Sequence, residues 1–205
     1  MPAGCSLAFP SILRVSCSPT DAELVTQLQA GQAPAFRLLV ERYQGPVYRT
    51  ALSLLRSPEE AEDVAQEVFV EVYQTIARFR SEATLRTWLY RLTTSQALKQ
   101  RRKARTKKRF AFLTSLLGTN HEVLHERPDH RHPLALLEEQ QQEQQLVEAI
   151  ARLPDSQQVA FVLRHEQGLS YEEIAAVLDT SRPAVESLLF RARQSLRKFL
   201  HPHLA

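Results

Sequence analysis

The chain has 205 residues, 43% of them hydrophobic, with 26 basic and 23 acidic residues and a formal net charge of +3. This length suits one medium domain or two small ones, and the apolar content excludes global disorder. The two cysteines, Cys5 and Cys17, have no accompanying pair of histidines, which excludes a disulfide scaffold and the usual zinc sites and fits a reducing cytoplasm.

The N-terminal segment MPAGCSLAFPSILRVSCSPT is mildly apolar. It lacks the basic start of a signal peptide, and Pro10 interrupts its apolar run. We therefore expect residues 1–20 to be a disordered extension, or to follow from a start codon chosen too far upstream. Because no stretch reaches the length of a membrane span, we expect a cytoplasmic protein that does not insert into membranes.

Apolar residues recur at helical spacing along almost the whole chain, and no segment shows sustained strand-like alternation. The sequence therefore predicts an all-α fold. The first helix is expected to be capped by Asp21, to run to about Ala30 and to stop at Gly31. A second helix is expected to follow Pro34 and to extend to about Leu55.

A third helix is expected to begin at Ser57, because Ser57 and Glu60 match a capping box and Pro58 stands at the first helical position. Its expected buried stripe is Val64, Val68, Val72 and Ile76. Its other faces carry six acidic residues and no basic residue before Arg78: Glu59, Glu60, Glu62, Asp63, Glu67 and Glu71.

After a loop at 79–83 comes a fourth expected helix, whose core face is Leu85, Trp88, Leu89 and Leu92. Its C-terminal end is KQRRKARTKKR, residues 99–109, in which eight of eleven residues are basic and none is acidic. Without this segment the chain has 18 basic and 23 acidic residues, a net charge of −5. Positive charge so concentrated is typical of nucleic-acid or anionic-membrane binding, and a solvated helix end is the alternative interpretation.

The helical pattern breaks down from Phe110 to about Pro133, which predicts a linker between two domains. No metal or other cofactor is expected there, because the histidines lack the usual ligand spacing. These histidines are His121, His125, His130 and His132. The alternative from another class is a small helical metal-dependent hydrolase that uses them, and it predicts a tightly bound, stoichiometric metal.

Beyond the linker, a Gln- and Glu-rich helix is expected over 134–152. The next helix is expected to be capped by Asp155 with Gln158 and to end before Gly168.

The last part of the chain predicts a helix-turn-helix: a short helix capped by Ser170 and Glu173, a tight turn, and a long helix that Ser181 can cap. The outward face of the long helix carries Glu186, Ser187, Phe190, Arg191, Gln194, Arg197 and Lys198. Polar and aromatic groups followed by cations suit a major groove flanked by phosphates, and an ordinary helical hairpin is the alternative.

Three segments resemble a bacterial RNA polymerase sigma factor of the extracytoplasmic-function type, in the order found in that family. EEAEDVAQEVFVEVYQ resembles the segment that grips the clamp coiled coil of polymerase. RFRSEATLRTWLYRLTTSQALKQRR resembles the region that melts the promoter and reads its −10 element. Residues 153–197 resemble the domain that reads the −35 element, and the resemblance as a whole covers about 21–200.

The resemblance implies two small helical domains joined by a flexible linker, the C-terminal one a helix-turn-helix. It divides the chain into an extension, a region 2 domain, a linker and a region 4 domain: 1–20, 21–110, 111–133 and 134–205. It implies a subunit without catalysis of its own that binds core RNA polymerase and promoter DNA, with an anti-sigma protein as the expected regulator. The alternative is a helix-turn-helix regulator that acts without joining polymerase, and such a regulator has no need of the acidic helix.

The family's motifs assign roles to individual residues. Polymerase contact falls to Asp63, Gln66, Glu67 and Glu71. Promoter melting and −10 recognition fall to Phe79, Arg80, Ser81, Ser95, Lys99, Arg101, Arg102 and Lys103. Recognition of the −35 element falls to Arg182, Glu186, Ser187, Phe190, Arg191 and Gln194. The chain departs from the family where Asn and Asp are common, at Ser95 and Lys99, and where Lys and Arg are common, at Glu186 and Leu188.

Overall fold

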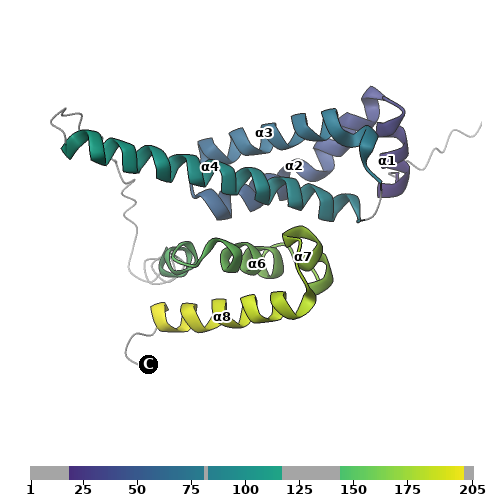
Figure 1. The fold of residues 1–205 in the computed structure, drawn as a ribbon. Helices are drawn as coiled ribbons and strands as arrows, with labels where there is room; N and C mark the ends of the chain where they lie inside the picture. Colours follow the sequence, from purple (N-terminus) through teal and green to yellow (C-terminus); the bar gives the residue numbers. More distant parts are fainter. Residues whose placement is uncertain (1–18, 81–82, 117–143, 201–205) are drawn as a thin grey trace, which may run out of the picture.

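The computed structural model describes residues 19–80, 83–116 and 144–200, and the backbone alone for 107–116 (Figure 1). Every regular element in these residues is helical, which confirms the predicted all-α fold. The helices form two bundles that correspond to the two expected domains. The first bundle contains α1 (Asp21–Gln29), α2 (Ala33–Leu55), α3 (Pro58–Thr75), the short 3-10 helix η1 (Ile76–Arg78) and α4 (Leu85–Leu116). Within it, α2, α3 and α4 pack against one another.

The start of α1 differs from the prediction. Thr20, and not Asp21, is the N-cap, and Thr20 forms a reciprocal capping box with Glu23. Asp21 instead accepts hydrogen bonds from the Arg42 guanidinium at 2.7 Å and the Tyr43 hydroxyl at 2.5 Å. A capping box satisfies two backbone donors at once, which leaves the Asp21 carboxylate free to join α1 to α2.

The α3 helix packs as its sequence predicts and has Ser57 as its N-cap, but Glu60 does not complete the predicted capping box, and the Ser57 hydroxyl donates to Glu59 Oε2 at 2.9 Å. The Ser57 hydroxyl caps the helix by accepting from the Glu60 backbone N–H at 3.2 Å. The predicted stripe is buried, with Val64, Val68 and Val72 at most 1% exposed. These valines face α2 and α4, so the acidic faces of α3 are turned away from the core of the bundle.

The second bundle is the predicted helix-turn-helix with supporting helices. It contains a helical segment at 144–151, α6 (Asp155–His165), α7 (Tyr171–Leu178) and α8 (Arg182–Leu200). The capping box of Ser170 and Glu173 is confirmed at the start of α7. The tight turn begins at Asp179, whose φ of 52° lies in the left-handed region and ends α7.

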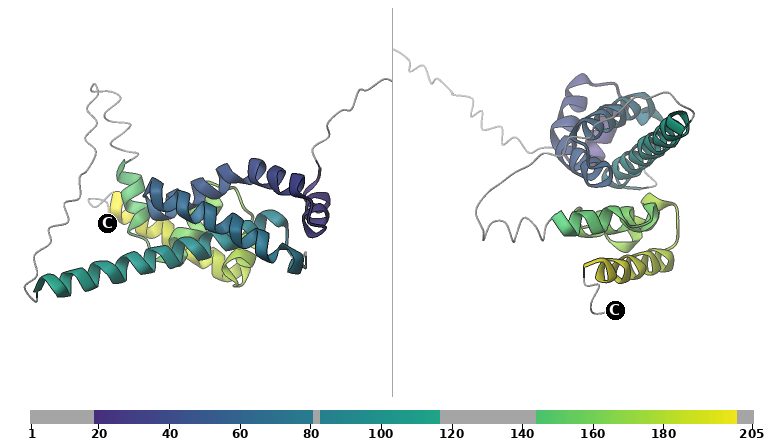
Figure 2. Two further views of the ribbon diagram at one scale, coloured as in Figure 1. Left: turned by 90° about the horizontal axis from the view of Figure 1, so that it is seen from above. Right: turned by 90° about the vertical axis from the view of Figure 1, so that its left-hand side faces the viewer.

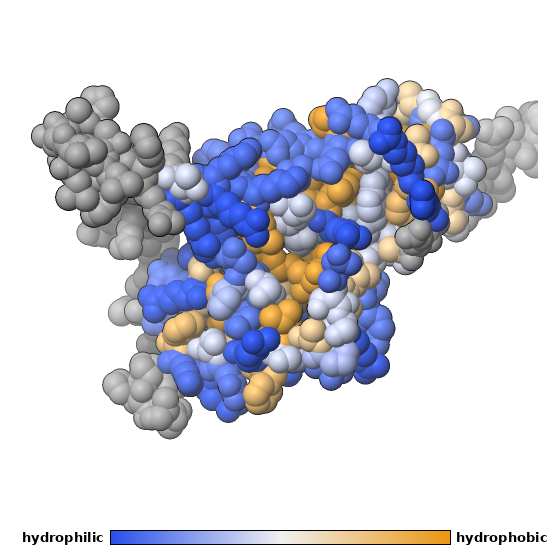
Figure 3. All heavy atoms as spheres, viewed as in Figure 1, coloured by the Kyte–Doolittle hydropathy of each residue, from blue (hydrophilic) through white to orange (hydrophobic). Residues whose placement is uncertain are grey.

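The two bundles pack against each other, and α4 lies along the boundary. One continuous buried core extends from Leu24 in α1 to Leu189 in α8. Helices α6 and α7 contact α2 and α4, while α8 lies on the side of its bundle that is remote from α4 (Figures 1 and 2). Figure 3 shows apolar residues gathered where the bundles meet, with hydrophilic residues around them. The expected linker starts at 111, but α4 continues to Leu116, and 117–143 lie outside the described residues.

Candidate functional site

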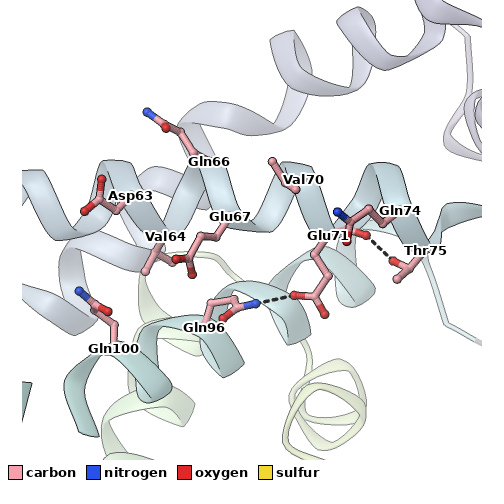
Figure 4. Close-up of a pocket in the computed structure, with 10 residues that line it drawn as sticks. All are labelled: Asp63, Val64, Gln66, Glu67, Val70, Glu71, Gln74, Thr75, Gln96 and Gln100. Carbon is pink, nitrogen blue, oxygen red and sulfur yellow. Dashed lines mark hydrogen bonds between the residues drawn. The ribbon is translucent and has the colours of Figure 1, made fainter. Parts of the chain in front are cut away.

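An open groove of about 700 Å³ lies between α3 and α4 (Figure 4). All four residues predicted for polymerase contact line it: Asp63, Gln66, Glu67 and Glu71. They share one face of α3 because their spacing of three and four residues matches the helical repeat. Asp63, Gln66 and Glu67 are exposed, whereas Glu71 is half-buried.

Among the side chains that the structure describes, the groove carries only negative charge. This lining contains three carboxylates, amides, a hydroxyl and two valines, but no Lys, Arg or His. The Gln96 side chain of α4 donates to Glu71 Oε2 at 2.6 Å and holds that carboxylate across the groove. Sequence analysis missed Gln96 and Gln100, although their spacing of four residues places them on one face of α4.

The loop before α4 is anchored at its first residue. The Phe79 ring packs on the Trp88 ring, with 4.8 Å between the ring centroids. The Gln29 side chain donates to the Phe79 carbonyl at 2.8 Å. Trp88 is half-buried against the core, as expected, and Phe79 packs there too. Arg80 is exposed, and Ser81 lies outside the described residues.

The basic residues of α4 fall into two groups. Lys99, Arg102 and Lys103 are exposed, as is Ser95. Arg101, in contrast, points toward the second bundle, and its side chain is only 16% exposed. The sequence treats 99–109 as one basic run, but the helical repeat separates its members onto different faces. The side chains of 107–109 lie outside the described part of the chain.

Arg101 contacts the second bundle through Gln158 and Asp155. Its guanidinium donates to Gln158 Oε1 and lies 3.5 Å from Asp155 Oδ1. Arg105, one turn later, lies 3.3 Å from the same carboxylate oxygen. Burial lowers the pKa of the Arg101 guanidinium from its ordinary value, and the nearby Asp155 charge opposes this shift.

The predicted cap of α6 is therefore wrong. The N-cap is Pro154, which makes no side-chain cap, and Asp155 and Gln158 are directed to α4. Gln158 is 1% exposed, and its Nε2 also donates to the Ser53 carbonyl at 3.3 Å. A buried amide needs partners for both ends, and at this position they come from the other bundle.

On α8 the residues predicted for −35 recognition are all exposed: Arg182, Glu186, Ser187, Phe190, Arg191 and Gln194. Phe190 is 57% exposed, which is unusual for a large apolar residue. Arg182 lies 3.0 Å from Glu172 and 3.2 Å from Glu186. The second pair joins successive turns at the start of α8, and the first joins α8 to α7.

Two further expectations concern metals and membranes. Within the described ranges, no group of three or more His, Cys, Asp or Glu side chains is placed to hold a metal ion. The four linker histidines lie outside these ranges. Among the helices that the structure describes, none is long and apolar enough to span a bilayer.

Known families match both bundles. The model of sigma-70 region 2 matches residues 39–107, and a model of sigma-70 region 4 matches residues 143–196. The RNA polymerase sigma-H factor of Pseudomonas aeruginosa is 32% identical over 184 residues, which cover 90% of this chain and 95% of the relative. The ECF RNA polymerase sigma-E factor of Escherichia coli is 32% identical over 183 residues, covering 89% of this chain and 95% of the relative.

Solved structures share the fold. CnrH in complex with the cytosolic domain of CnrY matches with a TM-score of 0.66 and 23% identity, over 89% of this chain and 98% of that one. The sigma factor RpoE of Bartonella quintana, in complex with the anti-sigma factor NepR, matches with a TM-score of 0.55 and 22% identity, over 82% of this chain and 98% of that one.

Regions 2 and 4 occur together and in order, which a helix-turn-helix regulator acting without polymerase does not require. The chain therefore belongs to the sigma-70 family, as a sigma factor of the extracytoplasmic-function group that directs RNA polymerase to initiate transcription at promoters.

Proposed function

We propose that the groove between α3 and α4 is the surface by which this sigma factor binds core RNA polymerase. The observation that carries the proposal is the lining of the groove, in which Asp63, Glu67 and Glu71 are accompanied by no cation among the described side chains. A surface of one sign raises both the rate and the specificity of association with a partner of the opposite sign. The complementary partner is a basic, elongated segment of polymerase, such as one arm of a coiled coil.

We further propose that the exposed cations of α4 bind promoter phosphates and that the outward face of α8 reads the −35 element. Arg102 and Lys103 supply affinity with little sequence information. Glu186 and Phe190 supply base contacts, since a carboxylate accepts from the amino group of cytosine. In this division 21–116 act as the region 2 domain, because α4 continues to Leu116, with 117–133 as the linker and 134–205 as the region 4 domain. Phe79, Arg80 and Ser81 capture an unpaired base of the opened −10 element.

As a sigma factor of this kind, the protein contributes no catalytic step of its own and works in the cytoplasm beside polymerase. We also infer that an anti-sigma protein regulates it. The inference is supported by the Bartonella quintana sigma factor of the same fold, which was solved in complex with the anti-sigma factor NepR.

The test of polymerase binding is a double charge reversal in the groove, Asp63→Lys with Glu67→Lys. Like charges facing each other at an interface cost several kcal/mol, so the variant should no longer co-purify with core polymerase. Both side chains are exposed, and the helical signal by circular dichroism should stay unchanged.

The matched control reverses two exposed carboxylates outside the groove, Glu41→Lys with Glu148→Lys. It changes the net charge by the same amount and should leave co-purification intact. Undiminished polymerase binding by the folded groove variant would refute the assignment. Equal loss of polymerase binding in both variants would mean that binding depends on net charge and not on the groove.

A further inference from the structure

The boundary between the two bundles is made of two kinds of contact. Near the start of α4 it is buried: the Tyr90 hydroxyl donates to Gln167 Oε1 at 2.9 Å, and Arg86 donates to the Gln167 carbonyl. Near the basic end of α4 it is ionic, where Arg101 and Arg105 share the Asp155 carboxylate. The ionic contacts use two side chains from the segment that we assign to promoter DNA.

A carboxylate and a phosphate offer an arginine the same chemistry. Both present anionic oxygens to the planar fork of N–H donors, and both form charge-assisted hydrogen bonds with it. Asp155 Oδ1 lies 3.5 Å from Arg101 and 3.3 Å from Arg105, which leaves no room for a phosphate oxygen at the same point between them. The two anions therefore compete for one site.

With the bundles packed together, Arg101 faces three acceptors: the Asp155 carboxylate, Gln158 Oε1 and, at 3.4 Å, the Ala151 carbonyl. Its side chain is 16% exposed, and a guanidinium with so little water costs free energy unless an acceptor faces it. Arg105 is 57% exposed and loses less when the contact breaks. Arg101 is thus held at the boundary, whereas Arg105 is exposed enough for another anion to reach it from solvent.

We propose that Asp155 is an internal substitute for a promoter phosphate. It occupies Arg101 and Arg105 while the two bundles are packed together, and it must be displaced before these arginines bind DNA. The proposal rests on the proposed role of α4 in promoter binding. The packing of the bundles occupies only part of the basic segment. Lys99, Arg102 and Lys103 stay exposed, and α8 lies away from the boundary (Figure 1). The packed arrangement then withholds part of region 2 from DNA and leaves the proposed −35 reading face of α8 accessible.

The test is Asp155→Asn in the full chain, without polymerase. Asn keeps the size of the side chain and removes its charge, so Arg105 loses its carboxylate partner and Arg101 keeps only its neutral acceptors, Gln158 Oε1 and the Ala151 carbonyl. Affinity for a short duplex DNA of arbitrary sequence, followed by fluorescence anisotropy, should rise about five- to tenfold at low salt. Glu148→Gln removes an exposed carboxylate of the same bundle, and it should change affinity by less than about twofold.

A second readout reports the position of the bundles. Spin labels at Glu41→Cys on α2 and Lys198→Cys on α8, both exposed, give the distance between them by electron paramagnetic resonance. Cys5 and Cys17 are replaced by Ser in this variant. Asp155→Asn should add a population at longer distance. If Asn lowers the helical signal, Asp155→Ser keeps a small polar group at the start of α6 and replaces it.

The outcomes separate this proposal from the one on which it rests. Unchanged DNA affinity in Asp155→Asn overturns the substitute role, whether the labels move apart or not. Lys99→Gln with Arg102→Gln, which leaves Asp155 untouched, should weaken DNA binding in both backgrounds. If that pair weakens binding while Asp155→Asn has no effect, α4 still binds DNA and only the substitute is refuted. If neither change has an effect, the DNA role of α4 fails and the substitute fails with it.

Discussion

Helices α4 and α8 both carry cations that we propose bind DNA, yet α4 lies at the boundary between the bundles and α8 lies at an outer edge. The first part of α4 packs against α2 and α3 in its own bundle and against α7 in the other, and its C-terminal end projects beyond both bundles (Figure 2). α8 lies at the edge of its bundle, and every residue assigned to the −35 element is exposed. Arg101 on α4 therefore takes part in the packing of the bundles as well as in the proposed DNA surface, whereas the proposed reading face of α8 is separate from the buried face of that helix.

The largest difference should appear in stability. Leu89 in α4 is 1% exposed, and Leu89→Ala should lower the free energy of unfolding by about 2–5 kcal/mol, because it leaves a cavity. Phe190 in α8 is 57% exposed, and Phe190→Ala should change it by no more than about 0.5 kcal/mol. Denaturant unfolding of the full chain measures both values. Similar losses would mean that Phe190 packs in solution and that α8 is not a free face.

The second effect should appear in promoter choice. Glu186→Ala should change the preference among −35 sequences by about 1–3 kcal/mol at the affected base pair and leave the salt dependence unchanged. Binding of the holoenzyme to promoters with single changes in the −35 element measures it. Glu172→Ala is the control, since it removes the other carboxylate that holds Arg182 and should spare the preference. An equal shift in the control would assign the effect to the position of Arg182.

The smallest effect should come from the outward cations of α4. The triple variant Lys99→Gln, Arg102→Gln and Lys103→Gln should weaken holoenzyme binding about equally at all promoters. It should reduce the slope of log affinity against log salt by about 0.9 per lost contact on duplex DNA and by less on single strands. Titrations at several salt concentrations measure the slope.

The control for the triple variant removes two exposed cations from α2, Arg37→Gln with Arg49→Gln, and should keep the slope of the parent. Should the triple variant keep that slope as well, the outward part of the basic run is a solvated helix end.

Sequence analysis predicted the elements whose signals are local. The apolar stripe of α3 and the cap at Ser57 both depend on residues within one or two turns, and both are confirmed. The exposure of Glu186 and Phe190 followed from the helical period of α8 in the same way. Periodicity is reliable at these positions because each helix buries one face against its own bundle.

The errors occurred at polar residues with two possible partners. Asp21 and Asp155 each stand at the start of a helix, where a carboxylate is a common cap, and each is instead engaged by arginines distant in the chain. Gln158 reads as a capping residue and is the buried link between bundles. A local pattern predicts that a polar side chain at the start of a helix caps the neighbouring backbone. The sequence does not show which distant donor will be close enough to compete for that side chain.

The sequence by itself determined the helices, the concentration of basic charge in 99–109, the acidic face of α3 and the helix-turn-helix, because each depends on spacing along one element. The packing of the two bundles decided which of the basic residues are available. Lys99 and Arg102 face solvent, while Arg101 is turned to Asp155. The orientation of Arg101 depends on a contact with a residue more than fifty positions away. This contact contributes to stability only when the two bundles are packed together.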